Sequence, residues 1–263
     1  MDLLRLHIAG PVARILIDHP QRRNAFTRAM WRAVPGLVVR ALADPGVRVI
    51  ALQGAQPGAF AAGADISEFA QTYGDPQEAV RANEEIQAAA DALDASPLPV
   101  LALIEGACVG GGVALAVACD FRLASEQARF AVTPAKLGLS YHPNDLRRLV
   151  RACGLGAASE LLFGGQVWDA QRALQAGMVN QVLPAADFAA ATDSLLQAIA
   201  ANSVDANRAM KRGLRAVADN DAAAIAQSAQ DFQQLFAAPD FIEGRDAFLQ
   251  KRAAVFPSHR KSQ

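Results

Sequence analysis

The stretch from Pro97 to Asp120 constrains the fold of this chain more than any other part of the sequence. It contains a continuous aliphatic run, Val100 to Ile104, then three consecutive glycines, and then the apolar segment Val113 to Ala118. The aliphatic run predicts a strand that is covered on both faces, and the apolar segment predicts a short buried helix. A buried strand that leads through a glycine turn into a helix is typical of an α/β fold.

The glycine turn, Gly110 to Gly112, leaves its backbone N–H groups open to another molecule. Without Cβ atoms the backbone adopts unusual dihedral angles and a ligand can approach it closely. The alternative explanation is a turn chosen for tight strand–helix packing. A second small-residue stretch after a strand, Phe60-Ala-Ala-Gly-Ala-Asp-Ile66, favours a binding site. Two exposed backbone donors from separate loops are what an oxyanion hole requires.

Strand-like and helix-like segments alternate over roughly the first 190 residues, which predicts an α/β core. Asp75 and Asp169 stand where helix N-caps belong, and a polar, mobile segment is expected between Ile66 and Gly74. After residue 185 the strand signals end and Ala-rich helical patterns follow. We therefore predict a core over residues 1–190 and a helical oligomerisation region over residues 191–263, too thin to hold a large core of its own.

Composition and charge exclude several classes of function. Lys plus Arg number 25 and Asp plus Glu number 26, so the formal net charge of −1 favours neither nucleic acid nor another polyelectrolyte as a partner. No apolar run is long enough to span a bilayer and the first residues lack a signal-peptide layout, so we expect a cytoplasmic protein that binds no membrane. Cys108, Cys119 and Cys153 are dispersed, which predicts reduced core thiols and no metal site.

Several spaced motifs resemble the crotonase, or enoyl-CoA hydratase/isomerase, family over essentially the whole chain. They are Phe60–Ile66, Gly106–Asp120, Gly164 with Ala173–Asn180, and Glu243-Gly244 with Ala247–Arg252. The resemblance implies an α/β fold, a crotonase-like spiral of ββα units with a C-terminal α-helical trimerisation region. It also implies a homotrimer or a dimer of trimers that acts on a small-molecule acyl-CoA in fatty acid metabolism, with no cofactor beyond the coenzyme A of the substrate.

The resemblance assigns roles to individual residues. It implies that the N–H groups of Ala64 and Gly111 polarise the thioester carbonyl and stabilise an enolate. Ala62, Ala64 and Ile66 match the backbone that holds the adenine end of coenzyme A. The remaining matches to CoA-binding positions are one basic residue, Arg22 or Arg23, and two C-terminal residues that commonly reach CoA across a subunit boundary, Phe248 and Lys251.

The chain departs from the hydratases of this family at both glutamates that handle the water. Ala114 stands two residues after the glycine triplet and Pro134 stands four residues before Gly138, so neither position carries a proton donor or acceptor. Hydration needs a positioned acid–base group worth roughly 10²–10⁴-fold in rate. We therefore expect decarboxylation or double-bond isomerisation of an acyl-CoA. The alternatives are hydration by another acid–base group and a catalytically silent CoA-binding homologue.

The segment from Thr133 to Tyr141 resembles the methylmalonyl-CoA decarboxylase branch of the family, although Ala64 stands where that branch has a histidine. Loss of CO₂ generates the enolate directly, and Tyr141 would then return a proton to it. His142 falls where some family isomerases carry an aspartate, and an imidazole exchanges protons near neutral pH. The alternative is that Tyr141 packs its ring and bonds a carbonyl while His142 lies at the surface.

Two aspartates close to these loops are assigned structural roles. We expect Asp145 to cap the helix that opens at Leu146. Asp65 lies in the first small-residue stretch, and we expect it to shape that turn through local hydrogen bonds instead of acting as a base. These assignments leave Tyr141 and His142 as the predicted proton-handling residues.

Overall fold

A computed structural model describes the fold over residues 3–259. Within that range its centre is a six-stranded sheet with the order β1-β2-β3-β5-β7-β10. The strands are β1 (Leu4–Ala9), β2 (Val12–Ile17), β3 (Val49–Gly54), β5 (Val100–Ile104), β7 (Phe121–Ser125) and β10 (Gln181–Leu183). β1 and β2 form an antiparallel hairpin and all other neighbours are parallel, so the predicted α/β class is confirmed.

A second, smaller sheet carries the two small-residue loops. Its strands, in spatial order, are β4 (Ala59–Ala61), β6 (Ala107–Val109), β8 (Arg129–Ala131) and β9 (Trp168–Asp169). β4, β6 and β8 run parallel, whereas β9 is antiparallel to β8. Because β4 and β6 are parallel neighbours, their carboxyl ends open on the same edge of this sheet.

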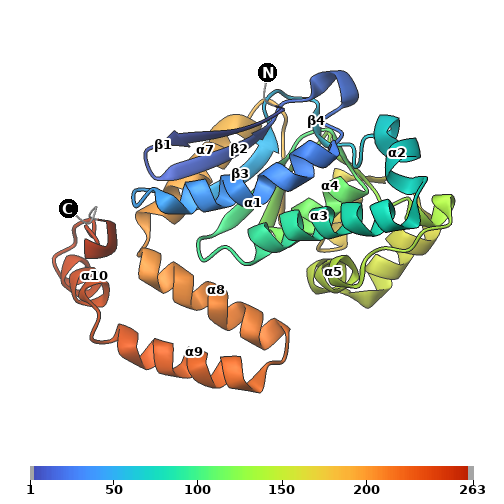
Figure 1. The fold of residues 1–263 in the computed structure, drawn as a ribbon. Helices are drawn as coiled ribbons and strands as arrows, with labels where there is room; N and C mark the ends of the chain where they lie inside the picture. Colours follow the sequence, from blue (N-terminus) through green and yellow to red (C-terminus); the bar gives the residue numbers. More distant parts are fainter. Residues whose placement is uncertain (1–2, 260–263) are drawn as a thin grey trace.

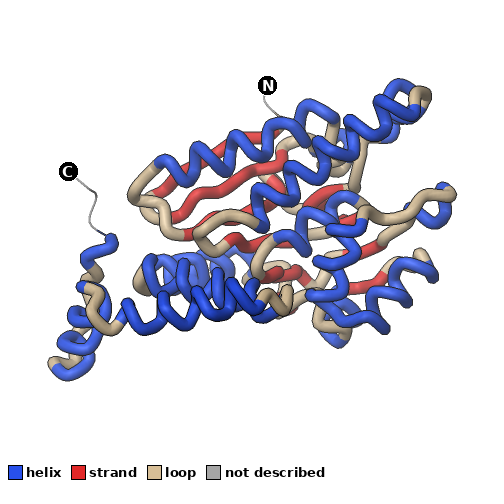
Figure 2. The backbone as a smooth tube through the Cα atoms, turned by 60° about the horizontal axis from the view of Figure 1, so that its bottom comes forward, coloured by secondary structure: helices blue, strands red, loops and turns tan. Residues whose placement is uncertain are grey.

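Helices lie on both sides of the strands (Figure 1, Figure 2). Those of the core are α1 (Arg28–Ala43), α2 (Phe69–Tyr73), α3 (Pro76–Asp94), α4 (Gly111–Ala118), α5 (Pro143–Gly164) and α6 (Ala170–Gln175). They are followed by α7 (Phe188–Ala201), α8 (Val204–Ala218), α9 (Ala222–Leu235) and α10 (Pro239–Leu249). Short 3₁₀ turns, which include η2 (Ile66–Glu68) and η3 (Pro134–Leu137), stand in the loops.

Strand β5 explains why the sequence shows a continuous aliphatic run. All of its residues are buried, because alternate side chains enter different clusters. Val100, Ala102 and Ile104 pack in the cluster that contains the buried faces of α1 and α3. Leu101 and Leu103 pack on the opposite side of the sheet with side chains of α7. A strand that is covered on both faces gains from apolar residues at every position.

The predicted helix starts are partly right. Asp75 caps α3 by accepting a hydrogen bond from Gln77 N at 2.8 Å, and Asp169 caps α6 through Arg172 N at 2.7 Å, so both caps are confirmed. The segment between Ile66 and Gly74, which the sequence predicts to be polar and mobile, contains η2 and α2, and its mobility stays a prediction. Asp65 starts this segment by accepting hydrogen bonds from Ser67 N and Oγ, which confirms its turn-shaping role.

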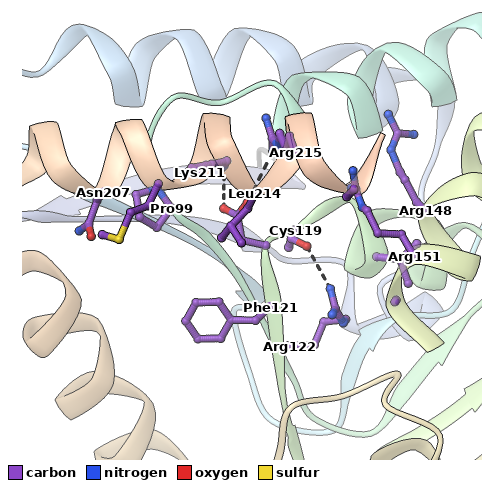
Figure 3. A pocket seen from close by; sticks show the side chains of 15 residues that line it. Pro99, Cys119, Phe121, Arg122, Arg148, Arg151, Asn207, Lys211, Leu214 and Arg215 are labelled. Carbon is purple, nitrogen blue, oxygen red and sulfur yellow. Dashed lines mark hydrogen bonds and ion pairs between the residues drawn. The ribbon is translucent and has the colours of Figure 1, made fainter. Parts of the chain in front are cut away.

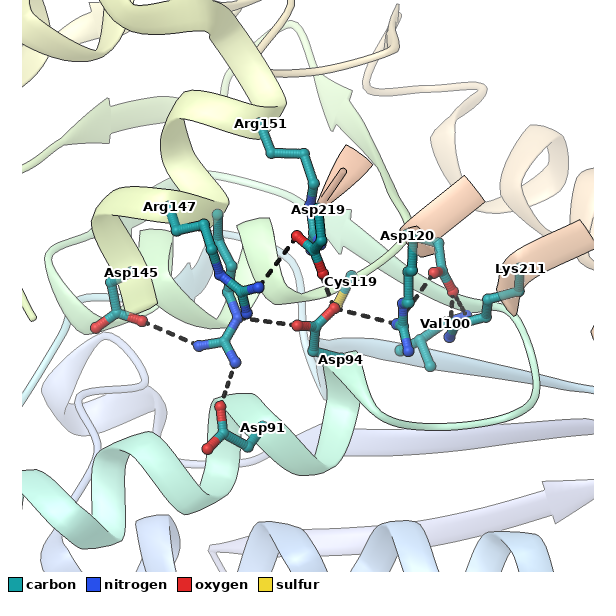
Figure 4. Close-up of polar contacts among 12 residues, drawn as sticks. Asp91, Asp94, Val100, Cys119, Asp120, Asp145, Arg147, Arg151, Lys211 and Asp219 are labelled. Atoms are coloured by element: carbon teal, nitrogen blue, oxygen red, sulfur yellow. Dashed lines mark hydrogen bonds and ion pairs between the residues drawn. The ribbon is translucent and has the colours of Figure 1, made fainter. Parts of the chain in front are cut away.

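The last three helices extend away from the sheets (Figure 1). α9 buries none of its residues, whereas α8 is tied to the core by a buried lysine. Lys211 Nζ donates to Leu98 O at 2.7 Å. It also donates to Asp120 Oδ2 at 2.6 Å (Figure 4). The helical character of the C-terminal part is confirmed, and the division of the chain at residues 190 and 191 stays a prediction.

Candidate active site

The two small-residue loops meet where β4 and β6 end. Ala59 pairs with Ala107 and Ala61 with Cys108, so the loop that starts at Ala62 lies beside the turn that starts at Gly110. Ligands of parallel sheets commonly bind outside the carboxyl ends of the strands. The sequence separates these loops widely, and the second sheet brings them together.

Glycine is required at several of these positions because the two loops touch. A Cβ on Gly63, whose φ is +93°, would lie 3.0 Å from Val109 O and 3.5 Å from Gly111 N. A Cβ on Gly112 would lie 2.3 Å from Ala61 O, which is closer than real Cβ atoms approach backbone. The small-residue pattern therefore serves close packing between the loops, and this packing sets the distance between their amides.

The backbone N–H groups without a partner in the described residues where the loops meet include one from each loop, those of Ala64 and Gly111. The first loop is fixed on both sides of Ala64, since Phe26 N donates to Gly63 O at 2.7 Å and Asp65 N donates to Phe26 O at 2.9 Å. Within residues 3–259 the N–H groups of Ala64 and of Gly111 donate to no acceptor. The first turn of a helix leaves such amides free, as at Gly111 in α4.

A cavity of about 960 Å³ lies in front of these amides, and both Ala64 and Gly111 line it. This is the upper end of the size range of small-molecule sites. Its remaining walls come from α2, α3, the segment 133–142 and the start of α5. The large apolar side chains of the lining are Trp31, Phe69, Tyr73, Ile86, Leu137 and Leu139. The cavity therefore offers an apolar space next to two free backbone donors.

Ala114 and Pro134 both line this cavity, so the two positions matched to the hydratase glutamates face the ligand space without a carboxylate. Ala114 sits in the first turns of α4 and is almost completely buried. The carboxylates among the described lining residues are instead Glu84 and Asp145. Any acid–base chemistry by a carboxylate in this cavity would use one of these two positions.

The structure places both predicted proton-handling residues on the cavity wall. Tyr141 Oη donates a hydrogen bond of 2.6 Å to the carbonyl oxygen of Gly110. Burial raises the pKa of Tyr141 well above its ordinary value, and the charge of Asp145 adds to the shift. His142 is the N-cap residue of α5, where its Nδ1 accepts a hydrogen bond of 3.2 Å from Asn144 N. With Nδ1 an acceptor, a neutral His142 carries its proton on Nε2.

The predicted capping role of Asp145 is wrong. α5 begins at Pro143, three residues earlier than the sequence suggested, so Asp145 lies inside its first turn. The side chain is only 3% exposed and lines the cavity. Burial raises the pKa of the Asp145 carboxyl, although Gln87 and Arg148 oppose the shift. Proline favours the first helical position, and this signal could have identified Pro143 as the start.

The residues matched to CoA binding fall into two groups. Ala62, Ala64 and Ile66 lie on the cavity, with Ile66 74% exposed at its edge. The loop that carries Arg22 and Arg23 is adjacent, because Ala62 N donates to Arg23 O at 3.1 Å. Burial acts to raise the pKa of the Asp65 carboxyl, but the hydrogen bonds from Ser67 and the charge of Arg22 outweigh it and leave the pKa lowered.

The two C-terminal matches, Phe248 and Lys251, do not join the cavity of their own protomer. Phe248 lies at the end of α10 and is 83% exposed, and neither residue is part of the cavity lining. α10 and α2, which lines the cavity, lie at opposite sides of the molecule (Figure 1). The structure of one protomer therefore brings together the predicted site residues of the two loops and of the segment 133–142. Phe248 and Lys251 lie apart from them.

A second cavity, of about 470 Å³, lies between α5, α8 and β7 and is rich in cationic side chains (Figure 3). Lys211 is paired with Asp120 at 2.6 Å, and Arg215 and Arg151 are paired with Asp94 at 3.1 and 3.0 Å. Of the two remaining cations, Arg148 pairs with Asp94 at 3.3 Å, and Arg122 donates to Met178 O at 2.6 Å and to Cys119 O at 3.0 Å. These pairings neutralise or satisfy the cations, so the cavity with the free amides is the candidate active site.

Two further findings concern the part of the chain that the structure describes. None of the helices there has the length and apolarity that crossing a membrane requires. The same residues contain no cluster of three or more His, Cys, Asp or Glu that could hold a metal ion.

Parallel strands whose loops place two backbone amides at the wall of an apolar cavity are an arrangement that can hold the oxygen of a bound carbonyl group. Comparison with known proteins identifies the family. The family model for enoyl-CoA hydratase/isomerase matches residues 7–259. The 2,3-dehydroadipyl-CoA hydratase of Escherichia coli is 32% identical over 251 residues, which cover 93% of this chain and 94% of that protein. The short-chain-enoyl-CoA hydratase of Clostridium acetobutylicum is 29% identical over 249 residues, covering 92% and 93%.

Solved structures agree with this result. The crystal structure of a protein from Hyphomonas neptunium assigned to the same family has a TM-score of 0.93 and 44% sequence identity, covering 97% of this chain and 98% of that one. The chain belongs to the enoyl-CoA hydratase/isomerase, or crotonase, family, and it is an enzyme of that family that acts on acyl-CoA thioesters. Both relatives are named hydratases, so the resemblance to the decarboxylase branch stays a prediction.

Proposed function

We propose that this enzyme forms a thioester enolate held by the N–H groups of Ala64 and Gly111, and that its reaction is double-bond isomerisation in preference to hydration. The observation that carries the proposal is the pairing of two free amides with a cavity that has no carboxylate at positions 114 and 134. A backbone oxyanion hole lowers the barrier to an enolate, because each donor contributes about 10²–10³-fold in rate.

Isomerisation needs one group to remove a proton from the α-carbon and a group to deliver a proton to the γ-carbon. The Asp145 carboxylate takes the α-proton of a 3-enoyl-CoA, and the electrons move onto the thioester oxygen at the two amides. When the dienolate collapses, the proton now on Asp145 is delivered to the γ-carbon, directly or relayed by the imidazole of His142, and the double bond then lies between the α- and β-carbons. Both side chains line the cavity beside the Gly111 loop.

Decarboxylation of a malonyl-type thioester is the second candidate, with a specific observation in its favour. When CO₂ leaves, the electron pair of the broken C–C bond stays on the α-carbon, and no base is needed. The absence of carboxylates at positions 114 and 134 therefore does not slow this reaction. His142 or Tyr141 would then protonate the enolate. The hydroxyl proton of Tyr141 is already used in its bond to Gly110, which makes His142 the more available donor.

The experiment that tests the proposal is a comparison of three thioesters, a 3-enoyl-CoA, methylmalonyl-CoA and crotonyl-CoA, on the purified full-length enzyme. We expect conversion of the 3-enoyl-CoA to its conjugated isomer. Release of CO₂ from methylmalonyl-CoA as the fastest reaction would select the second candidate. Fast hydration of crotonyl-CoA that survives Tyr141→Phe, His142→Ala and Asp145→Asn would contradict the proposal. Calorimetric binding of CoA without turnover of any thioester would identify a catalytically silent homologue.

We further propose that the active enzyme is a homotrimer or a dimer of trimers assembled through its C-terminal helices. Their exposed faces carry large apolar side chains, namely Met210, Leu214, Phe232, Phe236 and Phe248. Such a set of exposed apolar residues is typical of a protein–protein contact surface. Sedimentation equilibrium of the purified chain at micromolar concentration measures the mass directly, and a monomer would contradict this assembly.

A further inference from the structure

We infer that Tyr141 is a positioning residue whose hydroxyl fixes the Gly110–Gly111 peptide so that the Gly111 N–H points into the cavity. The inference rests on the proposed function, because it concerns the same pair of amides. Its starting point is the 2.6 Å hydrogen bond from Tyr141 Oη to the Gly110 carbonyl. A phenol carries one hydroxyl proton, and this contact uses it. The hydroxyl therefore acts on the protein backbone, next to the atoms that hold the substrate.

The geometry of the peptide unit connects the Gly110 carbonyl, which Tyr141 holds, with the Gly111 N–H. The carbonyl of Gly110 and the N–H of Gly111 belong to one planar trans peptide, so the oxygen and the amide hydrogen point in opposite directions. Holding the oxygen from one side therefore sets the direction of the N–H on the other side. The contact also strengthens the donor, because hydrogen bonds that follow one another through an amide polarise each other.

The glycine turn needs such an anchor at Gly110, because no side chain packs against the Cα of that residue. Gly110 has φ 51° and ψ −113°, and a Cβ built on it would meet no atom within 4 Å. The turn is held by hydrogen bonds instead. Gly110 N donates to Ala131 O at 2.8 Å, and its carbonyl accepts from Val113 N at 2.9 Å and from Ala114 N at 3.2 Å. Tyr141 is the contact that reaches this carbonyl from a separate segment.

Tyr141 itself is held firmly enough for this task. Its ring packs against the hydrophobic core, and the next residues, His142 and Pro143, start α5. The N-cap bond between His142 Nδ1 and Asn144 N fixes the backbone directly after Tyr141. The raised pKa of Tyr141, caused first by burial and then by Asp145, keeps the hydroxyl protonated, so it remains a donor across the neutral range.

The carbonyl stretch of a bound thioester reports the oxyanion hole without any proton transfer. The probe is [1-¹³C]butyryl-CoA, a saturated thioester, measured by isotope-edited infrared difference spectroscopy on the full-length enzyme. In the wild type we expect the stretch at lower wavenumber when bound than when free. In Tyr141→Phe, which keeps the ring, we expect most of that displacement to be lost. Turnover should fall by about 10- to 100-fold for every thioester that the enzyme converts, as for a donor moved out of alignment.

Thr192→Val is the matched control, because it removes a hydroxyl that donates to a backbone carbonyl, Phe188 O at 2.8 Å, within α7. Thr192 is not among the residues that line the cavity, so the carbonyl displacement should persist in this variant. A full displacement in Tyr141→Phe would overturn the inference. If turnover were lost as well, Tyr141 would act directly in the chemistry, and if turnover were kept, its hydroxyl would have no role in the reaction. No displacement in the wild type would overturn the oxyanion hole itself, and the inference with it.

A second variant keeps the test decisive should Tyr141→Phe fold poorly. The chain has two tyrosines, so biosynthetic labelling of the Tyr73→Phe variant places 3-fluorotyrosine at position 141 alone. Fluorine makes the phenol a stronger donor with almost the same size. We expect a larger carbonyl displacement than in unlabelled Tyr73→Phe. An unchanged or smaller displacement in the folded, labelled protein would contradict the positioning role.

Discussion

Asp145 Oδ2 accepts a hydrogen bond of 2.8 Å from Gln87 Nε2, and this contact joins the start of α5 to α3 at the wall of the cavity. The other carboxyl oxygen accepts from Arg148 Nη1 at 3.4 Å. Gln87 Oε1 is buried and has no hydrogen-bond partner in the described part of the chain. The carboxylate is thus held in place by its neighbours, while its position on the lining leaves it within reach of a ligand.

The first prediction concerns the role of Asp145 in proton transfer. Asp145→Asn keeps the size of the side chain and removes the group that takes the α-proton, so we expect isomerisation to slow by about 10²–10⁴-fold. Because the pKa of Asp145 is raised, kcat/KM of the wild type should increase as the pH rises through that pKa. The residual kcat/KM of the variant should not show this increase with pH. Asp193→Asn, an exposed carboxylate on α7, should retain the wild-type pH profile.

The second prediction uses the same residue to measure stability against pH. The folded pKa of Asp145 lies above the unfolded value of about 3.9, so the folded state binds more protons in that window. Its contribution to the free energy of unfolding is therefore fully present at low pH and is lost as pH rises through the folded pKa. Urea unfolding of wild type and Asp145→Asn should show the wild type losing stability relative to the variant above about pH 4. A constant difference would contradict the raised pKa.

The third prediction tests the packing of the glycine turn against the Trp31 side chain of α1. A Cβ on Gly111 would lie 2.9 Å from the Trp31 ring, so Gly111→Ala must displace either the ring or the amide. We expect turnover of acyl-CoA to fall by about 10²–10³-fold, as when one oxyanion-hole donor is lost. Gly36→Ala, inside α1 and with no atom within 4 Å of the new Cβ, is the matched control. It should leave turnover unchanged, and equal losses in the two variants would contradict the local explanation.

The fourth prediction concerns the buried guanidinium that neutralises the wall behind the site. Arg148 is 1% exposed and pairs with Asp91, with Asp94 at 3.3 Å and with Asp145 at 3.4 Å (Figure 4). Arg148→Met leaves Asp145 without a cationic partner, and removal of one member of a buried pair costs about 3–5 kcal/mol. Arg5→Met breaks the more exposed pair with Asp18 and should cost less than about 1 kcal/mol. Chemical unfolding of both variants measures the contrast.

Structural features that depend on a few neighbouring residues can be predicted from this sequence. Some of the site residues are of this kind, and others depend on contacts between distant segments. The strand Val100–Ile104 and the cap Asp75 depend on patterns of a few residues, and both are confirmed. The placement of Ala64 and Gly111 at one cavity is predictable as well, since small residues after two strands indicate free backbone donors. These predictions need only the order of neighbouring residues and the family resemblance.

The features that the sequence did not predict depend on contacts between distant segments. Asp145 faces the cavity because α5 starts at Pro143 and because Gln87 of α3 meets its carboxylate. The segment after Ile66 is polar in sequence, yet α2 forms there, and it packs against α3. The bond between Tyr141 and Gly110 joins residues on different elements, and a sequence pattern does not encode that approach.

The last prediction concerns the position of Lys251, which matches a CoA-binding position but lies outside the cavity of its own protomer. In the proposed trimer it reaches the cavity of a neighbouring subunit and meets a phosphate of coenzyme A. Lys251→Ala should then raise KM for acyl-CoA by about tenfold, the scale of one charge-assisted hydrogen bond, with kcat changed less. Phe248→Ala should act in the same direction through lost apolar contact.

Mixed oligomers decide whether Lys251 acts across the subunit boundary. A Lys251→Ala subunit keeps the free amides of its own cavity. A neighbouring Gly111→Ala subunit supplies an intact Lys251 to that cavity, so this site has the complete set of groups. Co-expressed mixtures should therefore show more activity at low acyl-CoA concentration than the weighted sum of the two parent variants. If each subunit used its own lysine, every site in the mixture would carry one defect or the other. The activity would then equal the weighted sum, and Lys251 would have to reach the cavity of its own chain by a movement of α10.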